Sequence, residues 1–258
     1  MTQQLIIDRD LVFGGASRHT ANIGGRPSNE NQVVYYDDFK SKAIDATNDY
    51  TFEVVNSGSA TVTVPHMLTL TTGAADNDDA EFAMGVEWYG KYNAVMEVRF
   101  RMDDVDKSAI NVGFNDAQAE DSADEIAIMS TGAGTITSSA TNCALFFYDT
   151  DDTSATLNAI AVNSDTDGTT HTTSSGATDG QMFTVRVELV DNGTTADAVF
   201  YANNSGIEID PQRDIIGFEA AAVPRATALC PYIALINHKS GNGETMDIDY
   251  IKLWQDRY

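Results

Sequence analysis

Three short segments rich in aspartate are the first residues of this sequence that could bind a ligand. They are Asp76-Asn77-Asp78-Asp79, Asp149-Thr150-Asp151-Asp152 and Asp165-Thr166-Asp167-Gly168. Clustered carboxylate oxygens suit Ca²⁺, but no segment continues into the EF-hand loop with its terminal carboxylate. Solvated acidic turns explain the pattern more simply. We therefore predict no metal site and no cofactor, and we expect a chelator to shift the melting temperature by no more than about a degree or two.

A second candidate is an aromatic cluster, Trp88, Tyr89 and Tyr92, around Gly90 in a predicted turn. Exposed aromatic rings can stack on the face of a sugar, but rings in such a place also cover one end of a core or fill a subunit contact. Both interpretations stay open. These three residues are the sugar-binding candidates of the sequence.

The other reactive side chains are scattered and match no catalytic motif. Two cysteines, Cys143 and Cys230, lie in predicted strands at a spacing that supports neither a disulfide framework nor a thiolate metal site. HExxH, CxxC, GxSxG, Walker and dinucleotide-binding patterns are absent. The four histidines are His19, His66, His171 and His238. We predict no catalytic residue.

The charge of the chain excludes several partners. The 258 residues include 39 acidic and 15 basic ones, for a net charge of −24. Such a surface repels nucleic acid and anionic membranes. The sequence also has no apolar run of about 20 residues and no signal-peptide layout. These features predict a soluble protein made in the cytoplasm.

Residues 1–31 differ from the rest of the chain. They are neutral and contain the pairs Gly14-Gly15 and Gly24-Gly25, so the whole net charge lies in residues 32–258. We predict an extended arm that attaches to a partner, followed by one domain over 32–258. The apolar residues of the arm that would contact the partner are Leu5, Ile6, Ile7, Val12 and Phe13.

From Val33 onward, apolar side chains recur at every second position, as in half-buried strands. Met96, Val98 and Phe100 alternate with charged residues, including Glu97, and the segment from Phe183 repeats this pattern. The predicted core includes Met96, Val98, Phe100, Phe183, Val185, Val187 and Phe200. About a dozen such strands predict an antiparallel sandwich or barrel. Only two short segments, 117–124 and 211–222, have a helical pattern.

Both ends of the predicted domain resemble a known family. Tyr35-Tyr36-Asp37-Asp38-Phe39 and the closing segment from Met246 to Gln255 are similar to the first and last strands of concanavalin-like (laminin-G-type) jelly rolls. The resemblance implies an all-β, two-sheet antiparallel jelly-roll sandwich with both chain ends in one sheet. The closing segment also resembles the end of laminarinase-type glycoside hydrolases.

The resemblance to those hydrolases implies three carboxylates at alternate positions of one strand, which place two of them about 5–5.5 Å apart. The nearest segment, Asp124 to Met129, puts at most one carboxylate on either face. We therefore predict that the protein is not an enzyme.

A jelly roll with a neutral arm, an acidic body and no catalytic set resembles the cement or decoration proteins of tailed bacteriophages. This resemblance implies a structural virion protein on the outer capsid surface, made in the host cytoplasm. Its expected partners are the major capsid protein or other virion subunits, and a homo-oligomer, with a trimer favoured. The alternative is a carbohydrate-binding, lectin-like module, free or on a phage tail fibre. High negative charge serves solubility in either case.

Overall fold

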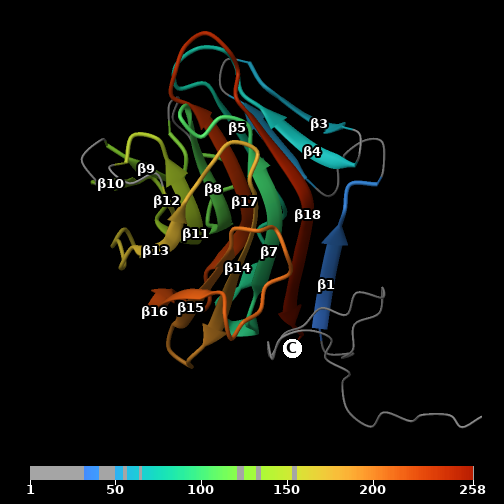
Figure 1. Cartoon of the computed structure of the whole chain (residues 1–258). Coiled ribbons are helices and arrows are strands. Elements are labelled where there is room, and N and C mark those ends of the chain that lie inside the picture. Colours follow the sequence, from blue (N-terminus) through green and yellow to red (C-terminus); the bar gives the residue numbers. More distant parts are fainter. Residues whose placement is uncertain are drawn as a thin grey trace, which may run out of the picture.

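The alternating sequence pattern forms strands throughout the computed structural model. It describes residues 32–40, 50–54, 57–63, 66–120, 125–131, 135–152 and 156–257. Two large antiparallel sheets pack face to face (Figure 1). The one helix in these ranges is a short 3-10 turn, η1 (Gly90–Tyr92). None of the described segments forms a helix with the length and hydropathy to cross a membrane.

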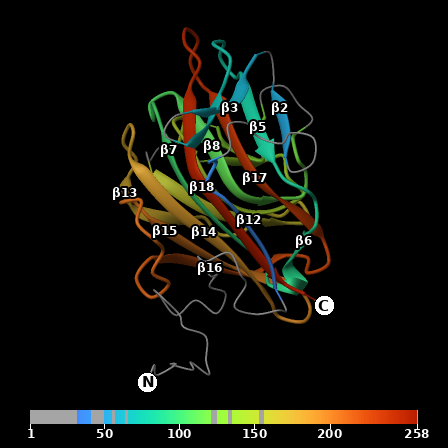
Figure 2. The same ribbon diagram turned by 90° about the vertical axis from the view of Figure 1, so that its right-hand side faces the viewer.

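Sheet A contains both ends of the described chain. Its strand order is β16-β15-β14-β7-β18-β4-β3, and β1 pairs with β18. The pairing of β1 with β18 is visible in both views (Figures 1 and 2). The strands are β1 (Gln32–Asp37), β3 (Ser59–Thr63), β4 (Met67–Thr71), β7 (Val95–Met102), β14 (Met182–Asp191), β15 (Ala196–Asn203), β16 (Ile215–Val223) and β18 (Thr245–Asp256).

Sheet B has the order β13-β12-β11-β8-β17-β5-β2, and β6 pairs with β17. The strands are β2 (Thr51–Val54), β5 (Asp79–Ala83), β6 (Trp88–Tyr89), β8 (Ser108–Asn115), β11 (Asn142–Asp149), β12 (Thr156–Asn163), β13 (His171–Gly176) and β17 (Ala228–Asn237). A separate hairpin, β9 (Ile128–Ser130) and β10 (Ile136–Ser138), lies outside β11 and β12 in Figure 1.

The main core lies between the two sheets and confirms the pattern read from the sequence. All of the predicted core side chains are at most 2% exposed. Phe100 and Phe183 stack at 5.7 Å between ring centroids, and Phe146 of sheet B meets Phe200 of sheet A edge to face. The all-β jelly-roll fold and its placement of the chain ends in one sheet are therefore confirmed.

Neither predicted helix occurs among the described residues. Residues 211–214 form a turn and Ile215–Val223 is strand β16, paired with β15. The alanines at 220–222 favour a helix, but the β-branched Ile215 and Ile216 favour a strand. The backbone of β15 also pairs with this segment, and the strand forms. Of the other segment, residues 117–120 are irregular, and 121–124 lie outside the described residues.

Candidate functional site

One end of sheet B brings together three side chains that can bind a metal ion. Asp149 ends β11, Asp151 follows two residues later, and His238 directly follows β17. Both strands flank β8, and the register aligns Asp149 and Ile236 with the same residue, Ala109. One ligand atom of each side chain lies within 4.8 Å of the others. Two ligands of one ion lie at most about 5 Å apart, so this spacing fits a single cation.

The cluster reaches from the interior to the surface, because Asp149 is buried and Asp151 is exposed. Asp149 is 1% exposed, and its two carboxylate oxygens accept the N–H groups of Asp151 and Ser130 at 2.9 and 2.7 Å. The His238 side chain is 6% exposed. Its Nε2 lies 3.2 Å from Oδ1 of Asp149, which is within ion-pair distance when the imidazole is protonated. The neutral imidazole presents the same nitrogen to a cation, which must displace that proton to bind.

The charges around His238 change its protonation. Burial lowers the pKa of His238, but the Asp149 carboxylate and the charges of Asp151 and Asp76 raise it, and the net direction is upward. The field at the cluster is therefore negative. A mixed set of carboxylate oxygens and an imidazole nitrogen suits a transition-metal ion such as Zn²⁺ or Mn²⁺ better than it suits Ca²⁺, which takes oxygen ligands.

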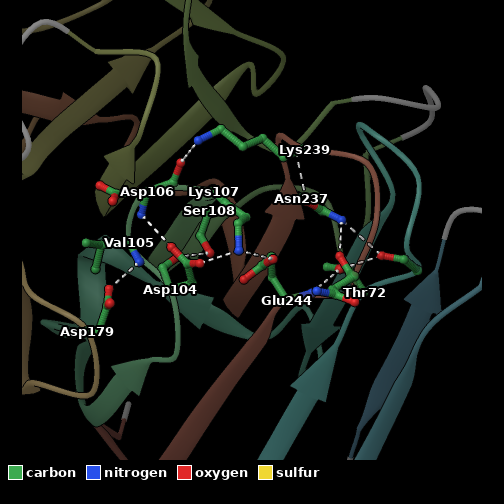
Figure 3. A network of polar contacts seen from close by, with 12 residues as sticks. Thr72, Asp104, Val105, Asp106, Lys107, Ser108, Asp179, Asn237, Lys239 and Glu244 are labelled. Carbon is green, nitrogen blue, oxygen red and sulfur yellow. Dashed lines mark hydrogen bonds and ion pairs between the residues drawn. The ribbon is translucent and has the colours of Figure 1, made fainter.

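A network of hydrogen bonds fixes the loops next to this cluster (Figure 3). Glu244 and Thr72 bond to each other twice, through Glu244 N to Thr72 Oγ1 at 3.0 Å and Thr72 N to Glu244 O at 3.1 Å. Lys239 Nζ donates to the Asp106 carbonyl at 2.9 Å, and Lys107 Nζ donates to Asp104. Three loops are thus joined into one platform.

The platform reaches the cluster through the backbone. His238 N donates to the Lys107 carbonyl at 2.7 Å, and Thr150 N donates to the Ser108 carbonyl at 3.1 Å. Asn237, which precedes His238, donates from Nδ2 to the carbonyl oxygens of Gly73 and Asn242. The site residues are therefore held by bonded loops as well as by strand ends.

The sequence found two of the three cluster residues and missed the third. Asp149 and Asp151 belong to the second Asp-rich segment, and the charge of Asp76 in the first segment reaches His238. The third segment contributes nothing to the cluster. No local signal links His238 to Asp149, because the strand order of sheet B brings them together. The predicted absence of a metal site stays a prediction.

The aromatic candidates separate into one core residue and two surface residues. Trp88 is 3% exposed and packs in the main core, as the second interpretation of this cluster states, so its ring is not exposed for stacking on a sugar. Tyr89 and Tyr92 are half-buried, with ring centroids 5.6 Å apart. Lys91 Nζ lies over both rings, 4.7 Å from each centroid, so it covers one face of each ring.

Other predicted site residues have no place in the described structure. Leu5, Ile6, Ile7, Val12 and Phe13 of the predicted arm lie outside the described residues, as does Asp124. The boundary between arm and domain stays a prediction.

The outward face of sheet B is occupied by the chain itself. Asn111 of β8 bonds to both backbone groups of Ile128, accepting from its N–H at 2.7 Å and donating to its carbonyl at 2.9 Å. Ile126 and Ile128 pack with Leu145 and Phe147 of β11 in a second apolar cluster. Glu125 belongs to the segment that was compared with the catalytic strand of laminarinase-type hydrolases. Its carboxylate accepts a hydrogen bond from Ser139 Oγ at 3.1 Å.

Comparison with solved structures places the fold among lectin-like sandwiches. The carbohydrate recognition domain of Emp47p is 10% identical, with a TM-score of 0.56 over 87% of this chain and 95% of that domain. The lectin UEA-II in complex with galactose is 12% identical, with a TM-score of 0.53 over 88% of this chain and 99% of the lectin. A Bacteroides ovatus enzyme chain, xyloglucan PUL GH43B, is 12% identical at a TM-score of 0.50, and only 38% of its length is matched.

These likenesses show the fold: a lectin and concanavalin-like β-sandwich. No protein-family model matches the chain, and no curated protein matches it.

Proposed function

We propose that this protein is a non-catalytic carbohydrate-binding protein, and that a sugar binds at the loop end of sheet B, beside Asp149, Asp151 and His238. The observation that carries the proposal is this three-residue cluster at the rim of a lectin-like sandwich. The similar structures support it, since one is a carbohydrate recognition domain and another a lectin with galactose bound.

The surface beside the cluster has the groups that a sugar needs. Asp76, Asp151 and Lys239 are exposed, and they offer carboxylate acceptors and an ammonium donor to hydroxyl groups. A divalent cation on the cluster would add a positive centre for oxygen ligands. The bonded platform keeps these groups in place, which lowers the entropy lost on binding.

The outward face of sheet B favours binding over hydrolysis of a polysaccharide. A hydrolase needs room for a chain and two facing carboxylates. Here β9–β10 and the residues before β9 cover that face with buried Ile126 and Ile128.

A glycan array followed by isothermal titration tests the proposal. Wild-type protein, supplied with Mn²⁺ or Zn²⁺, should bind a subset of glycans, and EDTA should weaken that binding. The variant Asp151→Asn should raise the dissociation constant by about tenfold or more, because it removes a charged ligand from the cluster. The variant Asp165→Asn is the matched control, since it makes the same change in an exposed Asp-rich turn outside the cluster.

Two results would overturn this function: no glycan bound by the wild type, or binding that neither EDTA nor Asp151→Asn changes. The expected effect of EDTA departs from the prediction made from the sequence, which could not place His238 beside Asp149.

Attachment to a phage capsid, the virion location and a trimeric state stay predictions from the sequence. None of the three solved structures compared above is a virion protein, and the arm on which that function depends lies outside the described residues.

A further inference from the structure

A groove between the edge strands of the two sheets carries a second set of polar side chains. β13 is an edge strand of sheet B and β16 an edge strand of sheet A, and the two lie next to each other in Figure 1. The groove between them has a volume of about 560 Å³. Ligand sites usually measure about 300–1,000 Å³. The groove shares no residue with the cluster at Asp149.

One wall of the groove is built around a buried carboxylate. Asp214 is 7% exposed and accepts hydrogen bonds from Arg213 Nε at 2.6 Å, Arg213 Nη2 at 2.8 Å and Asn203 Nδ2 at 3.2 Å. Burial raises the pKa of Asp214, but these hydrogen bonds and the one from the Asp210 N–H lower it by more. The net shift is downward, so the carboxylate stays ionised. Asp214 therefore fixes the guanidinium of Arg213 and the amide of Asn203 in one orientation.

Asn203 in turn fixes the turn that follows it. Its Oδ1 accepts hydrogen bonds from the Ser205 N–H at 2.8 Å and from Ser205 Oγ at 2.6 Å. Gln181 Nε2 donates to the Asn204 carbonyl at 2.7 Å. This wall is thus preorganised before any ligand arrives.

The open side of the groove mixes donors, acceptors and an apolar surface. Thr172 and Ser174 of β13 are exposed and line the opposite wall with hydroxyl groups. The Arg213 side chain is 54% exposed beyond its bonds to Asp214. Ile215 is 50% exposed beside it. Hydroxyl, amide and guanidinium groups around an aliphatic side chain suit a ligand that has hydroxyl groups on one edge and C–H groups on its face.

We propose that this groove is a second saccharide site, specific for a neutral mono- or disaccharide; the inference rests on the function proposed above. The charge of the groove sets the ligand class. Arg213 and Asp214 neutralise each other locally, and the net charge of −24 opposes an anionic sugar. A cationic ligand would face the exposed guanidinium. A neutral sugar meets neither repulsion.

The experiment is a two-site titration by NMR, in which amide shifts locate each bound sugar. Neutral saccharides selected on the array are titrated into wild-type protein and two variants. Thr172→Tyr/Ser174→Tyr fills the groove from exposed strand positions, and tyrosine suits a strand. Thr194→Tyr in the exposed turn between β14 and β15 is the matched control.

We expect the amides of Asn203, Asn204 and Arg213 to shift with a saccharide in the wild type and in Thr194→Tyr. The groove variant should weaken that binding by about tenfold or more, because the filled groove excludes the sugar. In Asp151→Asn the groove shifts should persist.

Two outcomes would overturn the groove, and they can be told apart. If the saccharide shifts only amides near His238, or if the groove variant binds as the wild type does, the second site is wrong and the proposed function stands. If no saccharide shifts any amide and none binds on the array, both proposals fail together.

Discussion

The two sheets differ most on the faces that point away from their shared core. The outward face of sheet B is apolar at its centre and lies beneath Ile126 and Ile128. The outward face of sheet A carries charges, yet Glu97 is 0% and Arg186 4% exposed. An antiparallel sandwich ordinarily has one buried and one solvated face on each sheet. Here both outward faces contain buried side chains. Apolar packing holds those of sheet B, and ion pairs hold those of sheet A.

The charges on sheet A form a row across neighbouring strands. The register places Glu97 of β7 opposite Arg186 of β14 on one side and Lys252 of β18 on the other. Arg186 Nε donates to Glu97 Oε2 at 2.7 Å, and Lys252 Nζ lies 3.7 Å from Oε1. The Tyr250 hydroxyl donates to the same Oε1 at 2.9 Å. The carboxylate therefore has partners at both oxygens.

The largest effect should follow from removing Arg186, the cation that bonds most closely to Glu97 in this row. Arg186→Met leaves Glu97 buried without its closest partner. Breaking a buried ion pair in this way costs about 3–5 kcal/mol. Denaturant unfolding should show that loss in the free energy of unfolding.

Arg225→Met is the matched control, because Arg225 also makes two bonds to one carboxylate, that of Asp191, at 2.7 and 2.6 Å. The Arg225 side chain is 37% exposed, and an exposed pair contributes about 0–1 kcal/mol. Equal losses in the two variants would mean that the row on sheet A is solvated and that the contrast between the sheets is wrong.

A somewhat smaller effect is expected from the apolar face of sheet B. Leu145 is 0% exposed and belongs to the cluster that β9–β10 covers. Leu145→Ala removes buried methyl groups and should cost about 2–5 kcal/mol. Ile207→Ala, at a 50% exposed aliphatic residue, is the control and should change stability by less than about 0.5 kcal/mol. A loss below about 1 kcal/mol for Leu145→Ala would mean that the hairpin packs loosely and leaves this face open.

The sequence predicted the core better than it predicted these outward faces. Alternation alone places Val98 and Phe100 inside and Glu97 outside, and the structure agrees on each direction. Burial of Glu97 depends on Arg186 and Lys252, which come from strands far apart in the sequence. A pattern along one strand does not contain that pairing.

Strand prediction failed where the side chains give no alternation. β13 runs through His171, Thr172 and Thr173 and has no apolar period, so it was not predicted. The segment of β16 carries Ile215, Ile216 and Phe218 at a spacing without strict alternation, and that spacing predicts a short helix. The groove lies between these two strands and therefore could not be predicted from the sequence. One Asp-rich segment of the sequence contains two of the three cluster residues, Asp149 and Asp151. His238 lies far from them in the chain, and no local pattern connects it to them.

The smallest effect concerns Glu81, a buried acid on strand β5 of sheet B. Glu81 is 2% exposed on the outward face, where it accepts hydrogen bonds from the Tyr232 hydroxyl and from the Glu120 N–H. Burial raises the pKa of Glu81 to about 8, although these bonds lower it, and the charges of Asp79 and Glu120 raise it further. The folded protein therefore holds a proton that the unfolded chain releases near its ordinary pKa of 4.5.

Because the folded state binds the extra proton, the contribution of Glu81 to stability is complete below about pH 4.5 and is lost as the pH rises toward about 8. Glu81→Gln keeps the acceptor oxygen and cannot ionise. Relative to the wild type, it should gain on the order of 1–2 kcal/mol in unfolding free energy between pH 5.5 and pH 7.5. Glu53→Gln, at the exposed residue paired with Glu81 on the neighbouring strand, should show no such gain. If the pH dependence of Glu81→Gln matches that of the wild type, Glu81 is ionised in the folded protein. Water then reaches the outward face of sheet B, and the contrast between the two sheets is wrong at this residue.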